Sequence, residues 1–219
     1  MAATVPSWAE TNMTTVEVFA DVWCPFAHVG IQRWLARRKQ AGRDDVRLRV
    51  YAWPLERVNN EKLSADHVRD EIQDLRQQVD IGDLFAGFSP ARFPTTTVPA
   101  LLLTDRAYEV SDECGELVAL ELRDRLWERG QDISQPELLT AVAADHGIGL
   151  PARWEDGDAA ERDWARGKAR GVEGSPHFFA GEIDMFCPSL RIERVGSHHL
   201  SIEDTEARFD ELCAASFPV

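Results

Sequence analysis

The chain has 219 residues, of which 44% are hydrophobic and 28% are charged. Both fractions lie close to globular averages, so the composition argues against a disordered chain and against a coiled coil. The 24 Lys and Arg residues stand against 38 Asp and Glu residues, and the formal charge of -14 disfavours nucleic acid as a partner.

The sequence offers no segment suited to crossing a membrane. Its longest obvious apolar run, Val98 to Leu103, is far shorter than the roughly 18 residues that a membrane-spanning helix needs. The first dozen residues lack the basic and apolar regions of a secretory signal. We therefore expect no membrane partner and a cytoplasmic location, and we expect residues 1–13 to form a disordered leader.

The first elements are predicted to be a strand, a helix and a second strand. Thr15 to Ala20 is β-branched and aromatic, as is typical of a buried strand. A helix is predicted from Pro25, because proline suits the first helical position, and Gly42 suits its end. Apolar and polar residues then alternate from Val46 to Tyr51, which predicts the second strand.

The middle of the chain is predicted to be helical. From about Leu63 to Arg170 the apolar residues recur at helical spacing, apart from a Gly- and Pro-bearing loop near residues 88–99. One helix is expected over Ser111–Gly130. Another is expected over Ser134–Gly147, where Glu137 completes a capping box with Ser134.

Strand-like pattern returns near the end of the chain. His177–Ala180 and Ile183–Phe186 flank a tight turn and predict a β-hairpin. A last helix is expected to begin at Ser201 and to run to about Phe217.

Cys24 is the main candidate for chemistry. It precedes Pro25 at the expected N-cap of the first helix, where free backbone N–H groups and the positive end of the helix dipole favour a thiolate over a thiol. This placement predicts a nucleophile. The alternative is an ordinary capping residue, since any helix has an N-cap.

The order of these elements and two motifs resemble a known family. Residues 21–30 (DVWCPFAHVG) resemble the active-site stretch of the DsbA-like, FrnE-type oxidoreductases, and residues 171–176 (GVEGSP) resemble their cis-proline loop. The resemblance implies an α/β, thioredoxin-like fold with an inserted all-helical domain. Residues 14–60 and 171–219 would form the thioredoxin-like domain, and residues 61–170 would form the insertion.

The resemblance also implies a cis bond between Ser175 and Pro176, with the Ser175 backbone exposed to a substrate strand beside Cys24. The alternative is a trans proline at the start of a strand. The chain departs from the pattern at Ala27, where dithiol members carry a second cysteine.

An internal Cys-x-x-Cys disulfide is therefore excluded, and a route through one cysteine becomes the expected one. Cys24 would form a mixed disulfide with a disulfide-containing peptide or small molecule, or with a low-molecular-weight thiol such as glutathione or mycothiol. No tightly bound cofactor is expected.

Cys187 is a second candidate near Cys24. The second strand of a thioredoxin hairpin returns towards the active site, so Cys187 at its end is expected to approach Cys24 and to serve in redox or ligand binding. The alternative is a buried structural cysteine. Pro188 suits a helix start, whose free N–H groups beside Ser189 are expected to hold a ligand carboxylate.

Two histidines and an aspartate complete the candidate polar site. His28 lies one helical turn after Cys24, where its imidazole can pair with the thiolate, although a solvated surface histidine explains it equally well. His177 follows Pro176 and can line the same cleft, unless strand alternation turns it into the core. Asp21 can accept a proton or cap the loop backbone.

Trp23, Pro25 and Phe26, with Trp53, would give the site an apolar wall for a peptide or a hydrophobic molecule, and core packing is the alternative. Cys114 and Cys213 are assigned to packing. The pair His198-His199 has no further ligand at metal spacing, so no metal site is expected.

Three functions are consistent with this sequence. The leading one is a thiol-disulfide oxidoreductase acting through Cys24. The second is a thiol-dependent transferase or isomerase similar to the kappa-class glutathione transferases and 2-hydroxychromene-2-carboxylate isomerases, whose members usually carry Ser where this chain has Cys24. The third is a non-catalytic binding module, which predicts an ordinary thiol pKa near ~8.5. A homodimer is left open.

Overall fold

The computed structural model describes residues 14–62, 64–195 and 199–218. The predicted leader, residues 1–13, lies outside the described residues. In chain order the elements are β1 (Thr14–Ala20), α1 (Pro25–Gln40), β2 (Val46–Ala52), α2 (Leu55–Val58), α3 (Ala65–Gln78), a 3-10 turn η1 (Pro90–Arg92), α4 (Val98–Val110), α5 (Asp112–Trp127), α6 (Pro136–Asp145), α7 (Asp158–Ala169), β3 (His177–Ala180), β4 (Ile183–Phe186), β5 (Leu190–Val195), β6 (His199–Asp204) and α8 (Glu206–Ser216).

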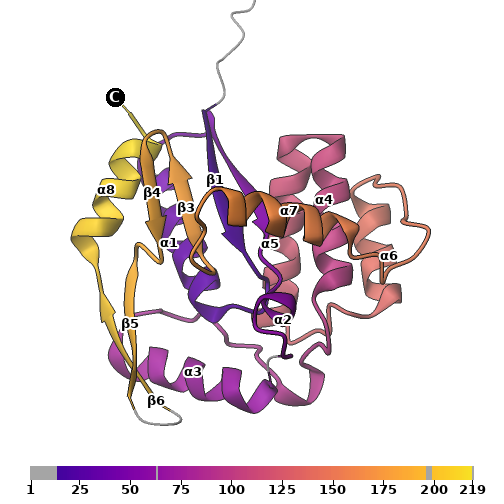
Figure 1. Ribbon diagram of the computed structural model, residues 1–219, viewed down its shortest axis with the longest axis horizontal. Helices are drawn as coiled ribbons and strands as arrows, with labels where there is room; N and C mark the ends of the chain where they lie inside the picture. The colour runs from indigo at the N-terminus through magenta and orange to yellow at the C-terminus, as the bar shows by residue number, and fades with distance from the viewer. Residues whose placement is uncertain (1–13, 63, 196–198, 219) are drawn as a thin grey trace, which may run out of the picture.

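The predicted α/β, thioredoxin-like fold class is confirmed. A four-stranded sheet has the order β2-β1-β3-β4, in which β1 runs parallel to β2 and antiparallel to β3. Helices α1 and α8 cover one face of this sheet, and α7 crosses the other face (Figure 1). The helices α2 to α7 all lie between β2 and β3 in the chain. The proposed domain boundaries at residues 61 and 170 stay predictions.

The two faces of β1 enter different cores, as strand alternation requires. Val16 and Val18 pack with Ile31 and Trp34 of α1. Phe19 packs on the opposite face with Tyr51 and Trp53. Helix α7 approaches this second core closely, because a Cβ at Gly167 would lie only 2.6 Å from Cζ3 of Trp53. Trp53 therefore belongs to this core and does not form a wall beside Cys24.

The outer edge of β2 is closed by side chains. The Leu48 N–H donates to Oε2 of Glu116 at 2.8 Å, and the Val50 N–H donates to the Tyr108 hydroxyl at 2.8 Å. The same hydroxyl donates to the Leu48 carbonyl at 3.0 Å. Unpaired backbone groups at a buried edge are costly, so these side chains join the helices α4 and α5 to the sheet.

A last helix is present, but its predicted start at Ser201 is wrong. Leu190–Val195 and His199–Asp204 pair instead as a second, two-stranded antiparallel sheet, and α8 follows Thr205. Strand β6 is stabilised by α3, where the Gln78 side chain donates to the Leu200 carbonyl at 2.8 Å and accepts from the Ile202 N–H at 3.0 Å. Gln78 thus bonds the β6 backbone as a neighbouring strand would. Because Gln78 is distant from β6 in the chain, no local sequence pattern predicts this contact.

Two details of the helical segment also differ from the sequence prediction. Gln135, not Ser134, is the N-cap of α6, because the Ser134 hydroxyl donates to Oδ1 of Asp132 at 2.6 Å. Helix α4 begins at Val98, at the end of the predicted loop, with Pro99 in its first turn. The predicted start at Ser111 is confirmed, since its side chain accepts from the Cys114 N–H at 3.0 Å.

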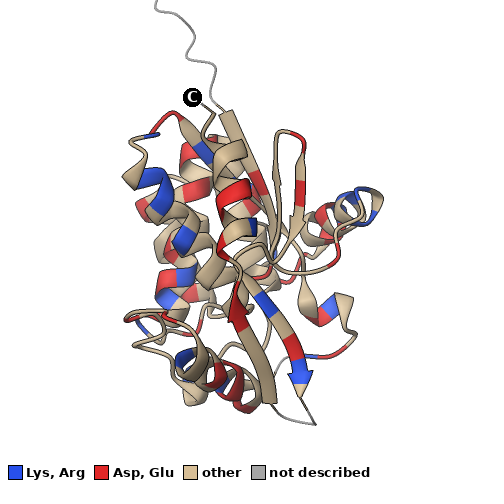
Figure 2. Ribbon diagram, turned by 90° about the vertical axis from the view of Figure 1, so that its left-hand side faces the viewer, with Lys and Arg blue, Asp and Glu red and all other residues tan. Residues whose placement is uncertain are grey.

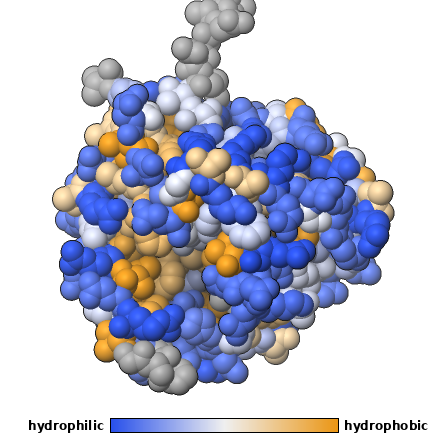
Figure 3. Space-filling view, in the orientation of Figure 1, coloured by the Kyte–Doolittle hydropathy of each residue, from blue (hydrophilic) through white to orange (hydrophobic). Residues whose placement is uncertain are grey.

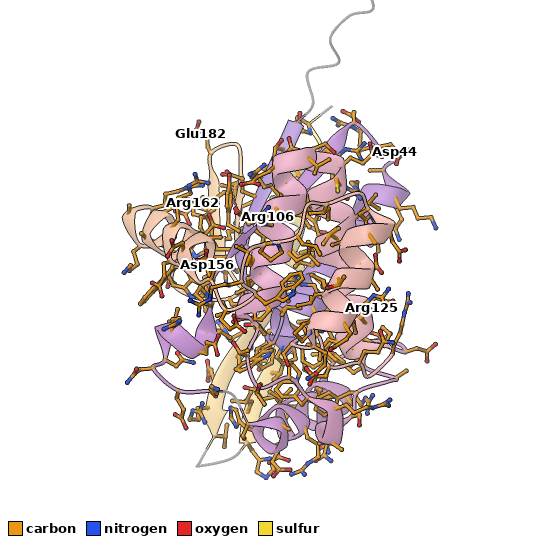
Figure 4. All side chains as sticks on the ribbon, turned by 90° about the vertical axis from the view of Figure 1, so that its right-hand side faces the viewer. Asp44, Arg106, Arg125, Asp156, Arg162 and Glu182 are labelled. Atoms are coloured by element: carbon orange, nitrogen blue, oxygen red, sulfur yellow. The ribbon has the colours of Figure 1, made fainter. Side chains whose placement is uncertain are left out.

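Charged residues of both signs are interspersed on the face shown in Figure 2. On the side viewed in Figure 4, Arg162 pairs with Asp105 and Arg125 pairs with Glu121. Partly exposed pairs such as these add little stability. None of the helices in the described part of the chain is both long and apolar enough to span a membrane.

We predict that Tyr108→Phe destabilises the fold by about 1–3 kcal/mol, because the change leaves the buried Val50 N–H without its partner. Urea unfolding measures the difference. The matched control is Tyr51→Phe, which removes the hydroxyl of the other tyrosine of the chain and leaves the bonds of Tyr108 at the β2 edge in place. Equal stability of the two variants would contradict the role of Tyr108 at this edge.

Candidate functional site

Cys24 lies where the start of α1 meets the loop before β3. It is the N-cap of α1, and its Sγ accepts from the Ala27 N–H at 3.4 Å. The thiol donates to the Ser175 carbonyl at 3.1 Å. The peptide bond between Ser175 and Pro176 is cis. The structure therefore brings together the two motifs that the sequence singled out.

Asp21 fixes the loop that carries Cys24. Its buried carboxylate accepts from the Trp23 N–H at 3.2 Å and from the Leu55 N–H at 2.7 Å. Its own N–H donates to the Ser175 hydroxyl at 3.0 Å. Burial raises the pKa of Asp21 to about 6. Of the two roles considered from the sequence, the contacts are those of a residue that caps the loop backbone.

The expectation of a stabilised thiolate at Cys24 is wrong for the free protein. The residue is only 4% exposed, and burial raises the pKa of the Cys24 thiol to about 12. Negative charge at Glu71 or Cys187 raises this pKa further, whereas hydrogen bonding with the Ser175 side chain and with the Ala27 N–H lowers it. Loss of hydration outweighs the donors at the helix start, because a charge is costly in a water-poor environment.

His28 does not pair with Cys24. It is fully buried, and its Nε2 bonds Oε1 of Glu128 at 2.9 Å while its ring packs against Phe85 and Trp127. Burial lowers the pKa of His28. The residue lies one turn from Cys24 along the helix, as predicted, but it faces the helical segment of the chain.

His177 lies on the opposite face of the sheet from α1. Its ring stacks on Phe179 with centroids 4.9 Å apart, and its two nitrogens bond the Glu173 N–H and Asp184. The prediction that it lines the Cys24 cleft is therefore wrong. Strand alternation gives the physical reason, since Phe178, the next residue, faces the α1 side.

The aromatic residues beside Cys24 divide between core and surface. Trp23 is fully buried and packs near Phe93, with ring centroids 5.7 Å apart. Pro25 is buried in the first turn of α1. Phe26 is only partly buried and contacts both main hydrophobic cores. Phe26 is thus the aromatic candidate for contact with a substrate.

Cys187 reaches the same loop from the other side. Its N–H donates to the Pro176 carbonyl at 2.9 Å, and the residue is 3% exposed. The predicted helix start at Pro188 is wrong, because the chain enters β5 directly. Ser189 is buried, its carbonyl accepts from the Thr205 N–H at 3.2 Å, and the expected set of free N–H groups does not form.

The sequence did not predict a role for Glu71, which lies on α3. Its charge acts on Cys24, and burial raises its own pKa to about 7, while Arg194 opposes that rise. Its side chain lies 3.3 Å from Nε2 of His67. No motif marks this glutamate, because only the packing of α3 near α1 brings it to the site.

A polar pocket of about 500 Å³ adjoins the loop held by Asp21. Arg57, Glu61 and Lys62 are among the residues that line it. Its lining begins at Glu56, the residue after Leu55, whose N–H donates to the Asp21 carboxylate. Separately, Figure 3 shows apolar side chains in a hollow of the surface between β5 and α2, near the start of α1 in Figure 1. Phe186, at the end of β4, is 37% exposed.

Among the described residues, no group of three or more His, Cys, Asp or Glu side chains is arranged to hold a metal ion. His198 lies outside the described residues. His199 is on β6, where its Nδ1 lies 3.3 Å from Oδ1 of Asp74.

Comparisons with known proteins agree with this geometry. Residues 15–198 match the family described as DSBA-like thioredoxin domain. No match was found among curated protein sequences.

Three solved structures share the fold. A 2-hydroxychromene-2-carboxylate isomerase is 18% identical with a TM-score of 0.55, over 78% of this chain and 88% of its own. The cytosolic disulfide reductase DsbM from Pseudomonas aeruginosa is 15% identical with a TM-score of 0.52, over 91% of this chain and 95% of its own. The structure of the same reductase with GSH is 18% identical with a TM-score of 0.54, over 91% of this chain and 96% of its own.

The raised pKa predicts how Cys24 reacts in the free protein. Below its pKa the thiolate fraction grows about tenfold per pH unit, so alkylation of Cys24 should accelerate continuously up to about pH 10. Peptide mapping after timed alkylation gives the rate at each cysteine. Cys24→Ser reports the background from the other three thiols, and a rate that levels off below about pH 8 would show a stabilised thiolate instead.

Proposed function

The chain belongs to the DSBA-like thioredoxin domain family, and we propose that it reduces disulfides through Cys24, by way of a mixed disulfide and with a low-molecular-weight thiol as co-substrate. The observation that carries this proposal is the position of the Cys24 thiol, between the first N–H groups of α1 and the Ser175 carbonyl. Substrate backbone can dock at the same loop, since Ser175 is the residue that faces the thiol.

One cysteine in this position fixes the order of events. Ala27 is fully buried one turn after Cys24, so the first turn of α1 supplies no second thiol. Cys24 sulfur attacks the substrate disulfide, one half of the substrate leaves as a thiol, and the other half stays bound to Cys24. A small thiol then attacks Cys24 sulfur, so that the second half of the substrate leaves as a thiol and the small thiol stays bound to Cys24. A second small thiol attacks the bound one, which frees the Cys24 thiol and releases the disulfide of the small thiol.

The electrostatics favour reduction over oxidation. A strongly oxidising thioredoxin-fold protein owes its potential to a stabilised reduced thiolate. Burial works against that here, because it raises the pKa of the Cys24 thiol to about 12. Cys24 therefore lacks the stabilised thiolate that makes such a protein a strong oxidant. The glutathione complex of the structurally similar disulfide reductase supports the same class of co-substrate.

The polar pocket suits the polar part of a small thiol. Its lining mixes the cations Arg57 and Lys62 with the carboxylates of Glu56 and Glu61. Glutathione carries both carboxylates and an amino group, so it complements a lining of mixed charge. The neighbouring apolar hollow suits an apolar group of the disulfide substrate (Figure 3).

Ala27 also favours a second candidate, a thiol-dependent isomerase or transferase acting on a small aromatic molecule. Such an enzyme needs a bound small thiol but no second cysteine. It would show saturable dependence on the thiol without oxidising it. The homodimer and the cytoplasmic location stay predictions.

The central test is capture of the mixed disulfide. We expect oxidised glutathione to convert Cys24 of the wild-type protein into a disulfide by way of a glutathione adduct, as shown by intact mass and peptide mapping. Cys24→Ser should lose both the adduct and disulfide reductase activity, whereas Cys114→Ser should keep both, because Cys114 lies on α5 away from the motif. Unmodified Cys24 after long exposure would refute the proposal.

The pocket has a test of its own. Lys62→Ala should raise the KM for glutathione about threefold to tenfold with little change in kcat, because it removes one exposed cation that holds a carboxylate. Arg129→Ala is the matched control, since Arg129 is an exposed cation whose partner Asp124, like Arg129 itself, is outside the pocket lining. The same KM in both variants would place the thiol elsewhere, and a parallel assay with mycothiol distinguishes the two thiols.

A further inference from the structure

We propose that Cys187 resolves the mixed disulfide at Cys24, so that the protein forms a redox-active disulfide between two cysteines that are far apart in the sequence. This inference rests on the proposed function, and it adds an intramolecular step to it. The two thiols would do the work that the Cys-x-x-Cys pair does in dithiol relatives.

The end of the hairpin brings Cys187 to the start of α1. His177 of β3 pairs with Phe186 of β4, and the hydrogen bond from the Cys187 N–H to the Pro176 carbonyl extends this pairing by one residue. Cys187 is buried in the same core as Val22 and Trp23, the two residues before Cys24.

The two cysteines meet at one loop. Cys24 donates its thiol proton to the carbonyl of Ser175, and Cys187 donates its N–H to the carbonyl of the next residue. Phe26, two residues after Cys24, contacts the core that contains Cys24 and also the core that contains Cys187.

The backbone at Cys187 is also unusual. Its φ is 43°, in the left-handed region that a residue with a side chain rarely adopts. Such strain often marks a functional segment.

The reaction balances without any further oxidant. The Cys187 thiol gives up its proton to solvent, and the thiolate attacks Sγ of Cys24 in the mixed disulfide. The bond between the two cysteines forms as the bond to the bound thiol breaks, and that thiol leaves and takes up a proton. Two molecules of a small thiol then reduce the new disulfide and leave as one molecule of their own disulfide.

The experiment compares full-length wild-type protein with Cys187→Ser after brief treatment with oxidised glutathione, followed by acid quenching. In the wild type, peptide mapping should find the peptides of Cys24 and Cys187 joined by a disulfide. Cys187→Ser should instead accumulate the Cys24–glutathione adduct, with a lifetime at least tenfold longer. Cys213→Ser is the matched control, since Cys213 packs in the same core as Cys24 and should behave as the wild type.

The outcomes separate the two proposals. An adduct at Cys24 that lives equally long in the wild type and in Cys187→Ser, with no joined peptides, would overturn the role of Cys187 and leave the proposed function intact. A Cys24 that forms no adduct in any variant would overturn the proposed function itself. Mapping of the wild type needs no variant, so it decides the role of Cys187 even if Cys187→Ser folds poorly.

Discussion

Two oxygen atoms of Ser175 hold this molecule together at its site. The hydroxyl accepts from the Asp21 N–H, and the carbonyl accepts from the thiol of Cys24, which stands 151 residues earlier in the chain. The carboxylate of Asp21 extends the link to Trp23 and Leu55. The end of β1, the start of α1, the loop before β3 and the segment after β2 are therefore fixed by one connected set of hydrogen bonds.

This arrangement sets two effects against each other at Cys24. The start of α1 offers a donor to the sulfur, which favours the thiolate, but the packing that aligns this donor also removes water. Burial is the stronger effect, and the pKa of Cys24 rises to about 12. The thiol is thus kept protonated in the free protein.

The helices between β2 and β3 are joined to the strands by side chains that imitate a neighbouring strand. Tyr108 and Glu116 bond the backbone at the edge of β2. Gln78 bonds the Leu200 carbonyl and the Ile202 N–H of β6. Because α3 carries both Gln78 and Glu71, the contact that orders the β5–β6 hairpin also positions a carboxylate whose charge acts on Cys24.

The sequence by itself determined the strand, helix and strand at the start and the hairpin of β3 and β4, because capping and periodicity are local. The resemblance to a known family pointed to Cys24 and the Ser175–Pro176 loop, which the fold brings together. Only the tertiary structure decided that His28 bonds Glu128, that His177 stacks on Phe179 across the sheet from α1, and that Leu190–Val195 and His199–Asp204 form strands. These outcomes depend on partners far away in the chain. A hydrogen bond to such a partner, or the loss of water around a thiol, leaves no trace in local spacing.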